Sequence, residues 1–185
     1  MSDLLPQAYL LGLIALLAGA AFVVGRQILR VRRDEMSLSR LGGEGGPKPS
    51  DAAGLYELAS VQLRKRLYSQ AADTLKQAVK LADSEKAPPE ARAVIENALG
   101  FALAAQNKYP AAIKHYQTAI RCKADYPVAL NNLAFALGKL QRPDEARSTY
   151  EQVLDLEPDN KTASKGLKTL KRRSGIDSKS DSKSA

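Results

Sequence analysis

The first part of the chain is continuously apolar rather than amphipathic. The seventeen residues from Ala8 to Val24 carry no charge, and at about 1.5 Å per residue such a helix nearly spans a hydrocarbon core of roughly 30 Å. Asp3 precedes the segment, and arginines follow it at positions 26, 30, 32 and 33. A signal peptide carries its positive charge before the apolar segment, so this order favours an uncleaved transmembrane anchor over residues 1–25. Cleavage within Ala18–Ala21 and a buried core helix are the alternatives.

The arginines also predict an orientation. Positively charged flanks stay on the cytoplasmic side of a membrane, so everything after Arg26 is expected to be cytoplasmic or in an equivalent compartment. Residues 42–49 contain four glycines and two prolines, a composition that does not sustain a helix. We therefore expect a basic juxtamembrane segment and a flexible Gly/Pro-rich linker over residues 26–51.

A helical pattern then repeats itself along the body of the chain. A small residue follows a leucine at three places, an alanine follows twelve positions later, and a large residue follows four positions after that. The three sets are Ala59, Ala71 and Leu75; Gly100, Ala112 and Tyr116; and Ala134, Ala146 and Tyr150. The second and third sets are 34 residues apart, whereas the first and second are 41 apart, so seven residues are inserted between them.

A period of 34 with this pattern resembles the tetratricopeptide repeat (TPR), in which each unit is a pair of antiparallel helices. The pattern predicts an all-α domain over residues 52–173, with repeats at 52–85, 93–126 and 127–160. Small residues let paired helices approach closely, so Gly100 is expected to face Ala112. The insert, with Pro88 and Pro89, predicts a longer first helix in the second unit, from Pro89 to Gln106, or else a loop.

Three units leave an apolar end that a further helix has to cover. Ala163, Leu167 and Leu170 share one face of a predicted capping helix at 161–173, and lysines occupy the other. Residues 174–185 are of low complexity and are expected to be a disordered tail.

Charge and composition exclude several functions. The net charge of +8 divides into +2 for residues 1–50, zero for 51–160 and +6 for 161–185, so the body lacks the basic face that nucleic-acid binding needs. Cys122 and His115 are the chain's single cysteine and histidine, and no phosphate loop or nucleophile motif is present. We therefore expect a non-enzymatic protein with no cofactor, metal site or small-molecule substrate.

The first helix of each TPR unit lines the concave side of the stack, which is where we place a protein-binding groove. Asn and Phe recur there 34 residues apart, and an amide beside an aromatic ring suits the backbone and side chains of a bound peptide. Replacing both asparagines by alanine is expected to weaken binding and to leave the fold intact. The alternative is that the rings pack between units and the asparagines are merely solvated. The predicted groove residues are Val94, Asn97, Phe101, Val128, Asn131, Phe135 and Lys139.

The anchor segment 4–33 with its arginine-rich exit, the first unit from Tyr56 to Val79, the single insert and the two regular repeats together resemble a family of cyanobacteria and plastids. Its members are small TPR proteins of the thylakoid membrane that assist photosystem I assembly or stability. The resemblance implies a single-pass thylakoid scaffold with its repeats on the cytoplasmic or stromal face, and photosystem I subunits or assembly intermediates as partners. The alternative is a bacterial membrane-anchored TPR adaptor for another complex, in envelope biogenesis or secretion.

Overall fold

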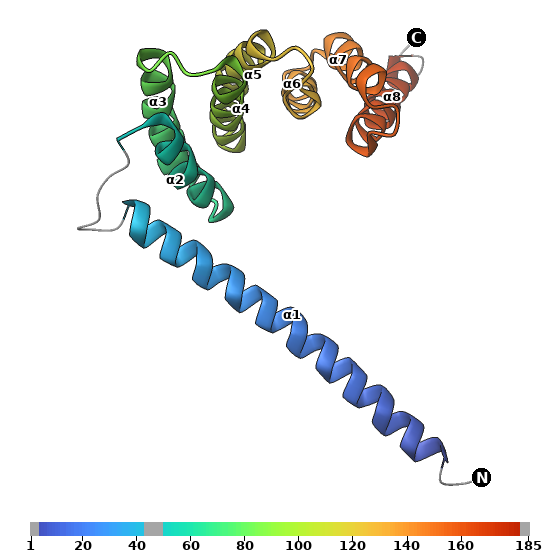
Figure 1. Cartoon of the computed structure of the whole chain (residues 1–185). Helices are drawn as coiled ribbons and strands as arrows, with labels where there is room; N and C mark the ends of the chain where they lie inside the picture. Colours follow the sequence, from blue (N-terminus) through green and yellow to red (C-terminus); the bar gives the residue numbers. More distant parts are fainter. Residues whose placement is uncertain (1–3, 43–49, 182–185) are drawn as a thin grey trace. The chain divides into compact units, whose positions relative to one another are not determined.

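The structure is a computed structural model that describes residues 4–42 and 50–181. Those residues form eight α-helices and no strand, which confirms the predicted all-α class (Figure 1). The chain divides into two compact units, Met1–Lys48 and Pro49–Ala185, which are described in turn.

The first unit is one long helix, α1, which runs from Leu4 to Gly42. Its stretch Leu10–Arg32 is 23 residues long, has a mean hydropathy of 1.9 and is not buried in protein, so its length and composition suit a membrane span. The helix includes the predicted basic juxtamembrane segment and ends at Gly42, where the predicted Gly/Pro-rich linker begins. No Gly or Pro lies between Gly25 and Gly42, and the intervening Arg, Gln, Leu and Met residues favour helix. The rest of the predicted linker, residues 43–49, lies outside the described residues.

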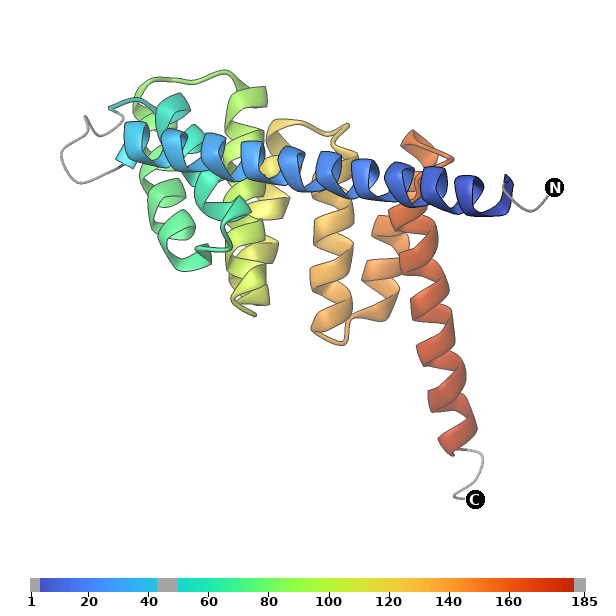
Figure 2. The ribbon, with the colours of Figure 1, turned by 90° about the horizontal axis from the view of Figure 1, so that it is seen from below.

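The second unit is a row of seven helices, each packed against the next in sequence (Figure 2). They form three successive pairs and one further helix, as the 34-residue period predicts. The helices are α2 (Ala52–Arg64), α3 (Tyr68–Ser84), α4 (Pro89–Ala105), α5 (Tyr109–Cys122), α6 (Pro127–Lys139), α7 (Pro143–Leu156) and α8 (Lys161–Asp181).

Local signals set the helix boundaries. The Asp51 carboxylate caps α2 by accepting a hydrogen bond of 3.0 Å from the Gly54 amide, and a proline stands in the first turn of each helix from α4 to α7. Each turn within a pair contains one residue with a left-handed backbone: Arg66, Asn107 and Gln141, at φ values of 59°, 60° and 59°. The same turn is therefore built three times, with the same spacing as the repeats.

The insert lengthens α4, as predicted. This helix has 17 residues, against 13 in α2 and 13 in α6, and it begins at Pro89, four positions before the predicted start of the second repeat. Pro89 is compatible with a first helical turn because that turn's amides have no intrahelical partner. Near the same end, the Glu85 carboxylate accepts a hydrogen bond of 3.3 Å from the Ala52 amide, so the loop after α3 is tied to the start of the domain.

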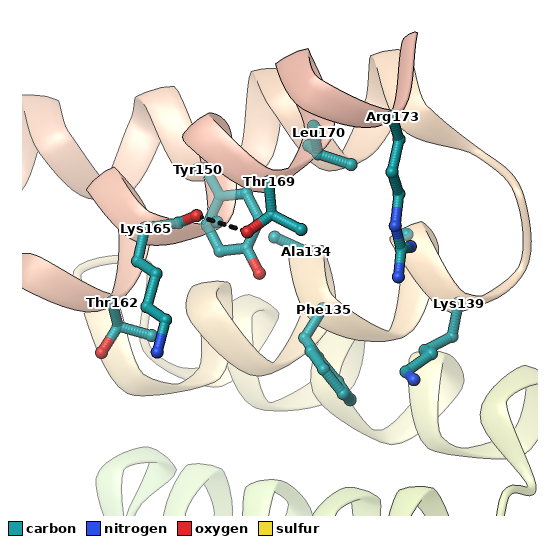
Figure 3. Close-up of a pocket in the computed structure, with 11 residues that line it drawn as sticks. Ala134, Phe135, Lys139, Tyr150, Thr162, Lys165, Thr169, Leu170 and Arg173 are labelled. Atoms are coloured by element: carbon teal, nitrogen blue, oxygen red, sulfur yellow. Dashed lines mark hydrogen bonds between the residues drawn. The ribbon is translucent and has the colours of Figure 1, made fainter. Parts of the chain in front are cut away.

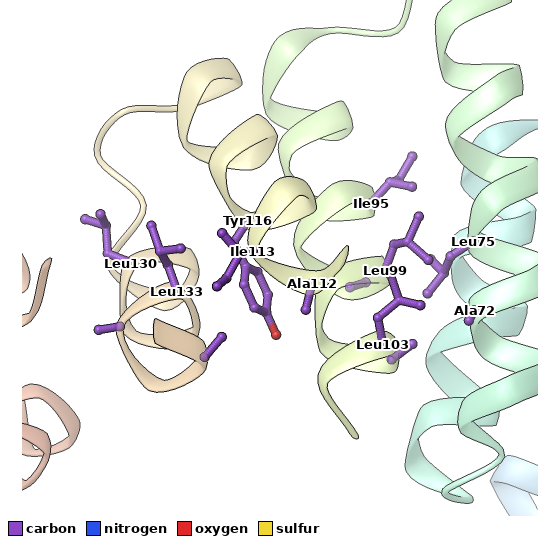
Figure 4. Packing of buried hydrophobic residues seen from close by; sticks show 14 of the residues in the cluster. Ala72, Leu75, Ile95, Leu99, Leu103, Ala112, Ile113, Tyr116, Leu130 and Leu133 are labelled. Carbon is purple, nitrogen blue, oxygen red and sulfur yellow. The ribbon is translucent and has the colours of Figure 1, made fainter. Parts of the chain in front are cut away.

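Small residues leave room for large ones in the core. A methyl group on Gly100 would lie 2.6 and 2.7 Å from Cε1 and Cδ1 of Tyr116, so the ring packs directly against the glycine. Tyr116 is 1% exposed and Ala112 is fully buried (Figure 4). The reason is geometric, since a flat ring from α5 fills the space that the missing side chain leaves on α4.

The last helix covers the end of the stack as predicted. Ala163 and Leu170 are buried, and Leu167 packs against the same core. The helix does not stop at Arg173, however, but continues to Asp181, so the predicted disordered tail begins too early. Ser174 and Gly175 disfavour helix by up to about 1 kcal/mol each, yet neither blocks the helical backbone as proline does.

The stack has an inner and an outer side. Among the described residues α2 contacts α4, α4 contacts α6 and α6 contacts α8, whereas α3, α5 and α7 make no comparable contacts with one another. The first helices of the pairs are therefore closer together and lie on the inside of the curve. We call the side formed by α2, α4, α6 and α8 the inner face.

Candidate protein-binding face

Among residues 50–173, whose side-chain exposure the structure describes, large apolar side chains are exposed at four positions, and three of them belong to the predicted groove. Phe101 is 43% exposed, Val128 55% and Phe135 52%, and the fourth is Leu156 at 42%, at the end of α7. Phe101 has one aromatic neighbour, Tyr68, whose ring meets it edge-on at 6.5 Å between centroids. Exposed aromatic groups in neighbouring repeats form an apolar row on the inner face, as expected of a surface that another chain covers.

The two asparagines of the predicted groove are hydrogen-bonded to other side chains of the domain, whereas the two phenylalanine rings are exposed. Asn97 donates to the Tyr126 hydroxyl at 3.4 Å and accepts from Asn132 at 3.0 Å. Asn131 is 9% exposed and donates to the Asn160 side chain at 3.3 Å. Asn97 therefore links its repeat to the next one, and Asn131 links α6 to the residue that precedes α8.

This arrangement corrects the expected effect of the asparagine substitutions. Removing Asn131 would take the partner from Asn160, whose side chain also accepts hydrogen bonds from the first amides of α8 at Thr162 and Ala163. A lost bond of this kind costs roughly 0.5–1.5 kcal/mol, so alanine at positions 97 and 131 is expected to lower the stability of the stack as well as to affect binding. The Oδ1 atom of Asn131 has no hydrogen-bond partner in the structure and is itself buried.

Val94 lines a cavity of about 500 Å³ at one end of the inner face, between the starts of α2 and α4. Most of its lining is apolar and includes Tyr56, Ile95 and Pro88, and its two charged residues, Glu85 and Lys86, are of opposite sign. The inserted residues between α3 and α4 supply part of the wall. The insert therefore shapes the surface as well as lengthening α4.

Phe135 and Lys139 line a second cavity, of about 260 Å³, at the other end of the same face (Figure 3). The Lys139 ammonium lies 5.3 Å from the centroid of the Phe135 ring, within the range of a cation–π interaction. The remaining wall comes from the first half of α8 and from Tyr150 of α7. We call this cavity the α6–α8 pocket, lined by Ala134, Phe135, Gly138, Lys139, Tyr150, Thr162, Lys165, Gly166, Thr169, Leu170 and Arg173.

Helix α8 also contributes to this face, which the sequence pattern alone did not predict. Its lysines appeared as the solvated side of a capping helix, yet Lys165 and Arg173 reach the pocket (Figure 3). The repeat period itself indicates these residues. Lys165 and Arg173 follow Asn131 and Lys139 by 34 residues, and both of those earlier residues were assigned to the groove. Extending the repeat period into α8 would have identified them.

His115 has a structural partner that its sequence context did not reveal. Its Nδ1 atom lies 2.7 Å from the carboxylate of Glu96, a side chain in α4 that is only 3% exposed. Arg92 is 4.0 Å from the same carboxylate and forms an ion pair of 2.8 Å with Asp83 of the preceding repeat. These groups join α3, α4 and α5, and no group of three or more metal-ligating side chains is found in the described residues.

Comparisons with known proteins agree with this architecture. Residues 100–141 match a TPR repeat family and residues 127–160 match the tetratricopeptide repeat. Two solved structures are similar: the first TPR of Spaghetti (RPAP3) bound to an HSP90 peptide (TM-score 0.62, 23% identity, 68% of this chain and 94% of that one) and MamA (TM-score 0.62, 23% identity, 69% and 71%). At this identity they show the fold alone. The fold and the repeats define a TPR protein.

Relatives extend the similarity beyond the repeats. The chain is 32% identical over 90% of its length to the chloroplastic TPR domain-containing protein PYG7 of Arabidopsis thaliana, and it spans 54% of that protein. It is 29% identical to the uncharacterized protein ycf37 of Guillardia theta, over 94% of this chain and 96% of the relative. The ycf37 of Cyanophora paradoxa is 28% identical over 85% and 89%. The chain is therefore similar to these TPR-containing relatives along most of its length, and not in the repeats alone.

Proposed function

We propose that this protein is a thylakoid-membrane scaffold whose inner face holds a segment of a photosystem I subunit or assembly intermediate. Helix α1 is the single-pass anchor, and the repeats lie on the cytoplasmic or stromal side. Groove residues Val94, Phe101, Val128, Phe135 and Lys139 contact the partner, whereas Asn97 and Asn131 hold adjacent repeats at the spacing that the contact needs. The protein performs no catalysis in this role and requires no cofactor.

One observation carries the proposal: the exposed row of Phe101, Val128 and Phe135 on the inner face. Exposed large apolar groups cost free energy in water, roughly 1.5–3 kcal/mol for each side chain that burial would cover. Aromatic side chains are also enriched among the residues that dominate binding energy at interfaces. Exposed apolar side chains on the first helices of two successive repeats fit an extended or helical segment better than a small molecule.

The membrane location and the photosystem I assignment in this proposal rest on different observations. The stretch Leu10–Arg32 suits a membrane span, and the arginines at its end favour a cytoplasmic or stromal repeat domain. A chloroplast relative similar over 90% of this chain supports a place in plastids or cyanobacteria. The photosystem I assignment follows from the family resemblance of the anchor, the insert and the repeats.

The test is a pull-down from detergent-solubilised thylakoid membranes with the tagged full chain, scored for photosystem I subunits. The variant carries Phe101→Ser and Phe135→Ser. Both rings are about half exposed, so their loss should move the stability of the fold little. If each ring contributes somewhat more than 1 kcal/mol to binding, the pair contributes about 2 kcal/mol, and capture affinity should fall about thirtyfold.

Leu156→Ser is the matched control, because it removes an equally exposed apolar side chain from α7, outside the inner face. Photosystem I subunits should remain with this control and with the wild type. Capture of those subunits by the double variant at the wild-type level would place their binding on another surface. Specific capture of an envelope or secretion complex in place of photosystem I would support the bacterial adaptor role.

A further inference from the structure

The α6–α8 pocket carries an unbalanced positive charge. Eleven residues line it and none is Asp or Glu, whereas Lys139, Lys165 and Arg173 are cationic. Four cations elsewhere in the repeat domain have carboxylate partners: Lys76 with Asp73, Arg92 with Asp83, Arg142 with Glu145 and Arg147 with Asp144. In the described part of the chain the three pocket cations have no such partner.

The cations surround an apolar floor. Lys165 and Arg173 descend from α8 toward α6, where Phe135 and Lys139 lie side by side (Figure 3). Most of the exposed lining is apolar and includes Ala134, Gly138 and Leu170. A ligand that matches this surface has negative charge at its edge and an apolar group beside it.

The rest of the inner face indicates what kind of molecule supplies that charge. The pocket shares Phe135 with the exposed row that continues through Val128 to Phe101, so a ligand seated in it can run on along the neighbouring repeats. A lipid headgroup would meet the three cations and leave the row uncovered. At the far end, the cavity beside Val94 has one charge of each sign and so has no preference for an anion.

We infer that the α6–α8 pocket binds an acidic segment of the partner protein. Aspartate or glutamate carboxylates of the segment pair with Lys139, Lys165 and Arg173, while a neighbouring apolar side chain packs on Phe135. The less charged part of the bound segment then continues along Val128 and Phe101. Charge at one end of the face thereby sets the direction in which the segment lies. This inference rests on the proposed use of the inner face and names the chemistry of what binds there.

The experiment uses the full chain in uncharged detergent micelles and two short fluorescein-labelled peptides. In one, Asp and Glu alternate with Leu, and in the other the acids are replaced by Asn and Gln. Binding is measured by fluorescence anisotropy at low and high salt. The acidic peptide should bind at least tenfold more tightly than the amide peptide at low salt, and added salt should remove most of the difference.

The variant Lys139→Gln, Lys165→Gln, Arg173→Gln should lose about tenfold in affinity for the acidic peptide and bind the amide peptide as before. Lys168→Gln is the control, since Lys168 is exposed on the same helix but does not line the pocket. All three pocket cations are on the surface, so an unchanged thermal midpoint should show that the triple variant is folded.

Two outcomes overturn the inference. One is equal binding of the two peptides, or equal losses in the triple variant and the Lys168→Gln control. The other is a triple variant that binds peptide normally but loses contact with phosphatidylglycerol in nanodiscs, which would assign the cations to the lipid surface. Neither outcome decides the proposed scaffold function, because the Phe101 and Phe135 pull-down tests the apolar row independently of charge.

Discussion

Gly100→Ala is the substitution that tests the packing of the repeats most sharply. The added methyl group would lie 2.6, 2.7 and 3.1 Å from Cε1, Cδ1 and Cζ of Tyr116. Carbon atoms in contact are normally about 3.5–4.0 Å apart, so the ring has to move. Tyr116 is 1% exposed and is packed on all sides, which leaves it little room.

The magnitude follows from two opposing effects. Alanine is favoured over glycine inside a helix by roughly 0.5–1 kcal/mol. Overpacking a well-filled core costs typically 1–3 kcal/mol. The overpacking should win, and we expect Gly100→Ala to lower the free energy of unfolding by about 1–2 kcal/mol. The assay is urea unfolding of the full chain in uncharged detergent, followed by circular dichroism.

Gly138→Ala is the matched control. A methyl group there would lie 3.7 Å from Cδ2 of Leu170 and 3.9 Å from Cβ of Ala146, which is ordinary contact. It should keep the helix-propensity gain and stabilise the protein by up to about 1 kcal/mol. Gly100→Ala should also cost less when Tyr116 is replaced by Leu. Equal stabilisation by the two alanine substitutions would refute this description of the core.

The remaining predictions concern pH, the end of the stack and topology. Burial raises the pKa of Tyr116 and Tyr150 above the ordinary value of 10.0, so the unfolded chain loses these protons first. The contribution of the two tyrosines to stability should therefore be constant below about pH 10 and be lost above it, and Tyr116→Phe should make the alkaline fall in stability shallower by up to about 1.4 kcal/mol per pH unit in unfolding titrations. Gly166→Ala would push into the Tyr150 ring and should increase amide hydrogen exchange in α8. Protease added outside right-side-out vesicles should leave the repeats intact, and their digestion would reverse the topology.

Sequence periodicity predicted the elements well because each repeat carries its own local instructions. Pro110 and Pro143 stand in the first turns of α5 and α7, and the longer α4 follows from Pro89 and the inserted residues. The end of α8 lacks such a signal and was placed too early, after Arg173. The composition beyond Arg173 permits helix, and nothing forces the backbone to leave it.

The candidate site was predicted less completely. Contacts between helices decide whether a side chain of the inner face stays exposed to bind a partner or bonds to the neighbouring helix. Phe101 and Asn97 share a helix face in sequence, yet the ring is exposed whereas the amide bonds to Tyr126 and Asn132. The four-residue spacing of Asn97 and Phe101 in the sequence does not predict that difference. The repeat pattern likewise predicts a small residue at position 100, but it does not predict that the Tyr116 ring packs against that residue.

The central claim, that the inner face holds a segment of a photosystem I protein, is tested most directly by site-specific photo-crosslinking in intact thylakoid membranes. A benzophenone amino acid replaces Phe135 on the inner face or Lys114 on the exposed side of α5. We expect the probe at position 135 to form a crosslink to a photosystem I subunit or assembly intermediate, and mass spectrometry to map it beside acidic residues. The probe at position 114 should give no such product. Crosslinks to photosystem I proteins from position 114 alone, or none from either position, would contradict the claim.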